Sequence, residues 1–144
     1  MFYKIDKGFE IMREIKFRAW DEEECKMYNP KDVIVCFDYV CHDVYVKKDN
    51  YKELFDYKLM QYTGFNNIDN IEIYEEDIVK RPDGRIGVVK YGRYSTSNVN
   101  GIGNIGFYID WNGDSLTRID LGYWLEKIDV LGNIYENKDL LEEI

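Results

Sequence analysis

Short segments of alternating apolar and polar residues recur along the chain, and turn-forming residues separate them. In residues 13–20, Ile15, Phe17 and Ala19 share one face and the basic side chains share the other. Alternation with a period of two is typical of a half-buried strand. Similar runs predict further strands at residues 33–40, 44–46, 59–63, 77–81, 85–91, 107–111 and 128–130.

Several of the intervening segments have the chemistry of tight turns. Pro82-Asp83-Gly84 joins two predicted strands and Asn112-Gly113 follows a third, so both predict hairpins. Asp69-Asn70 is a further predicted turn, because both residues tolerate left-handed backbone. Residues 92–106, rich in Gly, Ser and Asn, are expected to form a mobile loop. The segment 51–60 is ambiguous, since Asn50 is also suited to cap a short helix there.

The composition agrees with a mainly β fold. The chain has 144 residues, the length of a single domain, and contains 13 Tyr, 7 Phe and 3 Trp but only 2 Pro. Many short strands with turns every ~8–12 residues are typical of a small barrel or a strongly bent antiparallel sheet. We therefore expect β structure with minor α, including a helical turn near residues 137–141.

The net charge of −9 makes two classes of partner unfavourable. Nucleic-acid backbones and anionic membranes both attract clustered cations, which this chain lacks. No apolar run approaches the ~20 residues of a membrane helix, and four charges in the first ten residues argue against a leader segment. The odd number of cysteines, Cys25, Cys36 and Cys41, favours a reducing, cytoplasmic compartment with the thiols as packing residues.

The motifs with possible chemistry are each in an unfavourable context. Residues 101–106 spell G-x-G-x-x-G, but a strand pattern follows where a nucleotide site needs a helix. The three cysteines with His42 are a nominal zinc set, yet neighbouring strand residues point to opposite faces, which also separates Cys41 from His42 as a catalytic pair. The acidic runs 21–24 and 75–77 lack calcium-loop spacing. We expect no catalytic residue, no metal and no cofactor.

Aromatic residues near the glycine-rich loop and the acidic end are the candidates for partner contact. Tyr and Trp give large contact area at low entropic cost. The alternative is that these residues belong to the core or are scattered over the surface. The candidates are Tyr91, Tyr94, Tyr108, Trp111, Tyr123 and Trp124.

Several segments together resemble the YopX family. They are residues 12–21 (MREIKFRAWD), 59–64 (LMQYTG), 73–75 (IYE), 77–79 (DIV), 87–89 (GVV) and 130–137 (VLGNIYEN). The resemblance spans Met12 to about Leu141 and leaves residues 1–11 as an extension before the usual family start. It implies a phage or prophage protein with an SH3-like barrel. The expected division of the single domain 12–144 is N-terminal strands at 12–58, a barrel at 59–136 and a helical turn at 137–144.

The sequence departs from the family pattern at two turns. Glu76 and Asn70 stand where the family usually has glycine. If the backbone needs positive φ there, a Glu costs on the order of 1 kcal/mol, whereas Asn is a mild substitute. The turn before Asp77 is therefore expected to be either strained or altered.

The function predicted from these observations is that of a non-enzymatic protein-interaction module in the cytoplasm of a bacterial host, where it engages a host or phage protein. Homo-oligomers are compatible with the barrel edges. The alternative is a nucleic-acid mimic, because nine acidic and only three basic residues follow from Asp110 onward. Direct nucleic-acid binding, suggested only by the barrel, is the least favoured.

Overall fold

The computed structural model describes residues 13–94, 103–112 and 119–142, and the predicted extension at 1–11 lies outside them. The fold is mainly β, as expected, with antiparallel sheets and two short helices. None of the described helices has the length and apolarity to cross a membrane. The elements are β1 (Phe17–Asp21), β2 (Lys26–Tyr28), a 3-10 turn (Pro30–Asp32), β3 (Val33–Phe37), β4 (His42–Val46), β5 (Lys52–Leu54), β6 (Tyr57–Asn66), β7 (Glu72–Tyr74), β8 (Asp77–Lys80), β9 (Ile86–Tyr94), β10 (Asn104–Asp110), α1 (Leu121–Trp124), β11 (Asp129–Asn133) and α2 (Asp139–Glu142).

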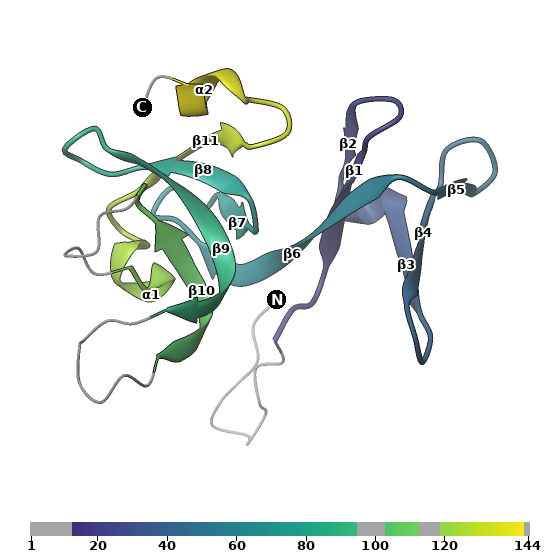
Figure 1. Cartoon of the computed structure of the whole chain (residues 1–144), viewed down its shortest axis with the longest axis horizontal. Helices are drawn as coiled ribbons and strands as arrows, with labels where there is room; N and C mark the ends of the chain where they lie inside the picture. The colour runs from purple at the N-terminus through teal and green to yellow at the C-terminus, as the bar shows by residue number, and fades with distance from the viewer. Residues whose placement is uncertain (1–12, 95–102, 113–118, 143–144) are drawn as a thin grey trace.

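The chain forms two lobes around separate hydrophobic cores (Figure 1). In the C-terminal lobe, which comprises β7–β11 with both helices, the sheet β10-β9-β8-β11 curls strongly into a half-barrel. Its core is large and contains two tryptophans. The buried residues are Ile73, Val79, Val89, Ile109, Trp111, Leu121, Trp124 and Ile128.

The N-terminal lobe, β1–β5 with the start of β6, is built from two facing sheets. Strands β2, β1 and the start of β6, which belong to the sheet β2-β1-β6-β7, pack against the sheet β3-β4-β5. Between them is a smaller core made of one face of each sheet, as a period of two requires. Its buried members are Ala19, Tyr28, Val44, Val46 and Leu54.

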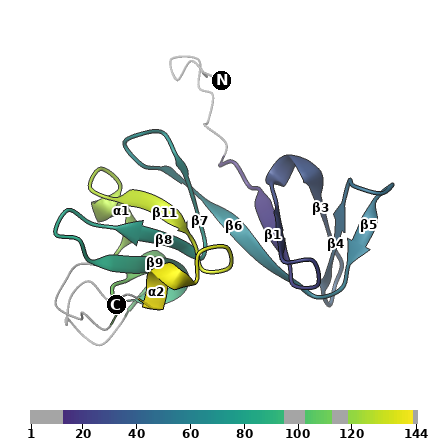
Figure 2. The same cartoon turned by 90° about the horizontal axis from the view of Figure 1, so that it is seen from above.

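The long strand β6 connects the lobes, as the two perpendicular views show (Figures 1 and 2). Its early residues pair with β1 and its later ones with β7. It therefore runs through the expected boundary at 58–59, and a single strand serves both parts. The contacts that join the lobes further include the Arg18–Asp77 ion pair at 2.7 Å and the stacked rings of Trp20 and Tyr135 at 5.8 Å.

The hairpin predicted around Pro82-Asp83-Gly84 is confirmed, since β8 and β9 pair in antiparallel register. The return from β3 to β4 and the strand at 107–111 are also present, the latter as β10. One local prediction is wrong in part, and one ambiguous segment is now assigned. Strands β9 and β10 extend to Tyr94 and from Asn104, so pairing shortens the expected loop; its residues 95–102 lie outside the description. The segment 51–60 contains β5 and the start of β6 rather than a helix.

The two turns where this sequence departs from the family pattern keep a backbone that suits glycine. Glu76 has φ +67° and Asn70 has φ +62°. Glu76 is held there by hydrogen bonds from its N–H to Val89 O and from Ile134 N–H to its carbonyl. The turn before Asp77 is therefore strained rather than altered, because the surrounding strands fix its conformation.

Candidate functional site

The predicted contact residues of β9 and β10 lie where the two strands pair. Tyr91 is opposite Phe107, and their rings meet edge to face at 5.0 Å. Tyr94 and Tyr108 stack at 5.7 Å and are half-buried. Tyr91 is the exposed member of this group, with 57% of its surface accessible. These tyrosines largely cover one another, so they offer little apolar surface beyond Tyr91.

Trp111 and Trp124 are in the core of the C-terminal lobe, which corrects their assignment to the surface. Their rings pack edge to face at 5.1 Å, and both side chains are buried. Burial of such large apolar groups is what this small half-barrel needs to fill its interior. Tyr123, by contrast, is exposed beside them, with the Lys127 ammonium 4.1 Å from its ring centroid.

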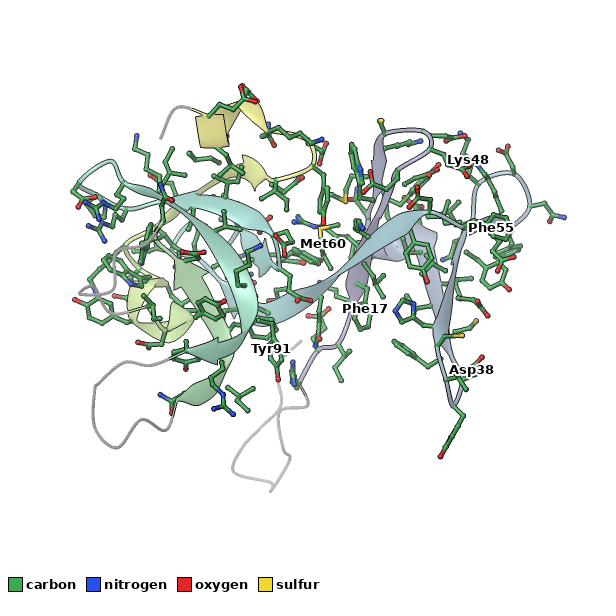
Figure 3. The ribbon with its side chains drawn as sticks, viewed as in Figure 1. Phe17, Asp38, Lys48, Phe55, Met60 and Tyr91 are labelled. Carbon is green, nitrogen blue, oxygen red and sulfur yellow. The ribbon has the colours of Figure 1, made fainter. Side chains whose placement is uncertain are left out.

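The two most exposed large apolar side chains of the described residues lie elsewhere, in the turn between β3 and β4. Tyr39 is 103% exposed and Val40 is 88% exposed, while Phe37 at the end of β3 is 64% exposed. We call residues 37–41 the β3–β4 tip. Figure 3 shows Asp38 at the free end of this hairpin, away from the C-terminal lobe.

Asp38 holds the β3–β4 tip in one conformation. Its Oδ1 accepts hydrogen bonds from the N–H groups of Val40 at 2.7 Å and Cys41 at 2.8 Å. These backbone donors lower the pKa of Asp38, so its carboxylate is charged at neutral pH. The Asp38 N–H in turn donates to the Cys41 carbonyl at 2.9 Å. Both apolar side chains are thus exposed on a turn that is already ordered.

A row of aromatic rings continues from the β3–β4 tip into the N-terminal lobe. Phe37 lies 5.9 Å from Phe17 and 5.8 Å from His42, and His42 lies 5.7 Å from Tyr57. We call Phe17, Phe37, His42 and Tyr57 the aromatic row. It supports the tip from behind, so the tip and the row form one continuous surface.

Hydrogen bonding fixes the orientation of His42 in this row. The Tyr57 hydroxyl donates to the His42 carbonyl at 3.0 Å, and its oxygen is 2.7 Å from His42 Nδ1. Because the hydroxyl has a single hydrogen, Nδ1 is the donor in the second contact. Burial raises the pKa of Tyr57, which keeps the hydroxyl protonated. His42 is therefore half-buried and has a structural role.

The three cysteines also differ from expectation, since Cys25, Cys36 and Cys41 are all exposed rather than packed. Cys25 and Cys41 belong to turns and Cys36 to the outward-facing end of β3. The charge of Asp38 raises the pKa of the Cys41 thiol, which disfavours a nucleophilic thiolate. Within the described segments, no group of three or more His, Cys, Asp or Glu side chains is arranged to hold a metal ion. The arrangement at the tip is suited to contact rather than to chemistry.

Sequence reasoning missed Tyr39 and Val40 because the pattern predicts a single strand over residues 33–40. The strand ends at Phe37. The available sign was Asp38, since an aspartate within an apolar run is suited to bond the N–H groups that follow and so to form a turn.

Comparisons with known proteins agree with this fold. The model of the family described as YopX protein matches residues 16–142. The crystal structure of protein EF1440 from Enterococcus faecalis is similar, with a TM-score of 0.53 and 21% identity, covering 90% of this chain and 99% of that one. At this identity the likeness shows the fold alone. No curated protein matches. Because the family match spans most of its length, the chain belongs to the YopX protein family.

Proposed function

We propose that this protein is a non-enzymatic interaction module of a phage or prophage, acting in the cytoplasm of the bacterial host, and that the β3–β4 tip binds an apolar pocket on a host or phage protein. The observation that carries the proposal is the nearly complete exposure of Tyr39 and Val40 on a turn held by Asp38.

Rigid presentation of apolar side chains is favourable for binding. Burying an exposed Tyr or Val side chain contributes roughly 1.5–3 kcal/mol each, from about 25 cal/mol per Å². An ordered turn retains more of this free energy, because it loses less conformational entropy when the partner binds. Phe37 belongs to both the tip and the aromatic row, so the other rings of the row extend the surface of the tip.

The test begins with affinity capture from prophage-induced cells, followed by calorimetry with the purified partner. The double variant Tyr39→Ser/Val40→Ser keeps Asp38 and the turn's backbone donors, so it is expected to fold while its affinity falls about a hundredfold. The matched control is Ile68→Ser/Ile105→Ser, which alters residues 68% and 67% exposed on other turns and strands. Equal affinities for all three proteins would contradict the proposal.

The same titration distinguishes the nucleic-acid mimic. A mimic binds through the acidic C-terminal part, so its affinity falls steeply as salt rises from about 50 to 500 mM and does not depend on the tip. The affinity of an apolar contact at the tip is expected to change little over that range of salt. Steep salt dependence with an unaffected tip variant would replace the present proposal with mimicry.

A further inference from the structure

Strand β2 is the edge of the sheet β2-β1-β6-β7, and its outer side is free. At both ends of the β1–β6 ladder, Tyr62 N–H bonds to Lys16 O and Glu22 N–H bonds to Asp56 O, each at 2.9 Å. Even-numbered residues of β1 therefore bond to β6 and odd-numbered ones to β2. Met27 is paired with the even-numbered residue Trp20, so the N–H and C=O of Met27 point away from β1. No backbone group of the described residues bonds to them there.

Two hollows flank this free edge, one on each face of β2, and both are lined in part by Lys26 and Met27. The first, about 430 Å³, is bounded also by Lys47 and Lys48. The second, about 480 Å³, lies at the junction of the lobes and is bounded by the stacked pair Trp20 and Tyr135. Met27 shares the face of its partner Trp20, so the aromatic hollow is on the Met27 side.

The hollow on the other face is cationic in a chain whose net charge is −9. Lys48 in Figure 3 lies on the turn after β4, and its ammonium is 3.7 Å from Glu24. Lys47 has no carboxylate partner among the described residues, and Lys26 contacts only the ring of Tyr28, at 4.8 Å. Asp32 also lines this hollow, so its three lysines outnumber its one carboxylate and give it a net positive charge.

We propose that the free edge of β2 binds an extended acidic segment of a partner protein by strand addition. This inference rests on the proposed function and adds a second contact site to it. The added residue opposite Met27 exchanges two backbone hydrogen bonds with it and places an apolar or aromatic side chain in the Trp20–Tyr135 hollow. Its neighbours, pointing to the opposite face, are acidic and lie near Lys26 and Lys47.

The probe is a capped peptide in which glutamate and valine alternate around one central tryptophan, measured by fluorescence anisotropy with the full chain. Saturable binding is expected below about 1 mM. Charge reversal in Lys26→Glu/Lys47→Glu is expected to weaken it at least about tenfold. The matched control Lys80→Glu reverses an exposed charge on β8 and is expected to leave binding unchanged.

Two modified peptides test the backbone pairing without any change in the protein. N-methylation of the central tryptophan removes the N–H that bonds to the Met27 carbonyl and is expected to abolish binding. N-methylation of an adjacent glutamate modifies an N–H that points away from β2, and is expected to have little effect. A peptide of the same composition with all glutamates grouped at one end is expected to bind at least about tenfold more weakly.

The inference is overturned if no peptide binds at about 1 mM, if both N-methylated peptides behave alike, or if Lys80→Glu weakens binding as much as the double reversal. It is also overturned if a single-stranded oligonucleotide displaces the peptide, or if Met27 is covered by a second copy of the chain at that concentration. The Tyr39→Ser/Val40→Ser variant is expected to bind the peptide normally. Failure at the edge is therefore distinguishable from failure at the tip.

Discussion

Replacing Asp77 with asparagine is expected to lower the free energy of unfolding by about 3–5 kcal/mol, the usual cost of removing one partner from a buried ion pair. Asp77 and Arg18 have side-chain exposures of 2% and 12%, and Asp77 Oδ1 is 2.7 Å from the Arg18 guanidinium. Asp77 Oδ2 also accepts the Tyr74 N–H at 2.8 Å. Both carboxylate oxygens are therefore used in the turn that joins the lobes.

Asparagine has one oxygen and one NH₂ group in place of these two acceptors. If its oxygen faces Tyr74 N–H, the NH₂ group faces Arg18, so two donors oppose each other and the guanidinium loses its counter-charge. Arg18 is otherwise held by the Tyr74 ring at 4.7 Å and by the Glu75 carbonyl at 3.2 Å, neither of which carries a charge.

Urea unfolding followed by tryptophan fluorescence measures this loss. For a chain of this size, 3–5 kcal/mol corresponds to a fall in melting temperature of roughly 6–20 °C. The control is Glu24→Gln, which disrupts exposed pairs with Lys48 and Lys52 and is expected to change the free energy of unfolding far less than Asp77→Asn does. If the free energy of unfolding of Asp77→Asn lies within about 1 kcal/mol of the wild-type value, Arg18 and Asp77 do not join the lobes in the way described.

Three further predictions concern single positions. Glu76→Gly is expected to be about 1 kcal/mol more stable than Glu76→Ala in urea unfolding, because both lose the Lys90 ion pair but only glycine relieves φ +67°; equal stabilities would contradict a strained turn. Gly87→Ala is expected to lower the free energy of unfolding by about 1–3 kcal/mol, since a Cβ there would lie 2.6 Å from the Trp111 ring. Gly106→Ala, whose Cβ would lie 3.7 Å from its nearest neighbour, is the milder control in the same melting experiment. Burial raises the pKa of Glu75 above its ordinary 4.5, so the unfolded chain releases that proton first and wild-type stability falls as pH rises through the interval between the two pKa values. Glu75→Gln is therefore expected to gain stability relative to the wild type between pH 4 and 7. A difference in unfolding free energy between variant and wild type that stays constant across that range would refute the raised pKa of Glu75.

Local chemistry made much of the fold predictable. The hairpin of β8 and β9 was recognisable because Pro82-Asp83-Gly84 forms a turn without help from distant residues. The strain at Glu76 was expected from the resemblance to the family, which usually has glycine at this position, and the φ of +67° agrees with it. Neither inference requires knowledge of which strands meet in space.

The candidate site depended on information that a single sequence does not carry. Tyr39 and Val40 continue an apolar run, and period alone does not separate a buried strand from an exposed turn. Trp111 and Trp124 carry no mark that distinguishes a core residue from a contact residue. The pairing of Arg18 with Asp77 joins residues 59 positions apart and follows only from the path of β6.

Hydrogen–deuterium exchange of the chain with and without its captured partner tests most directly whether the partner binds at the β3–β4 tip, because exchange rates report which surface the partner covers. Binding at the β3–β4 tip predicts slower exchange in peptides that contain residues 37–41, at Val40 and Cys41 above all. Unchanged exchange at the tip, with slowing confined to the C-terminal lobe, would contradict it.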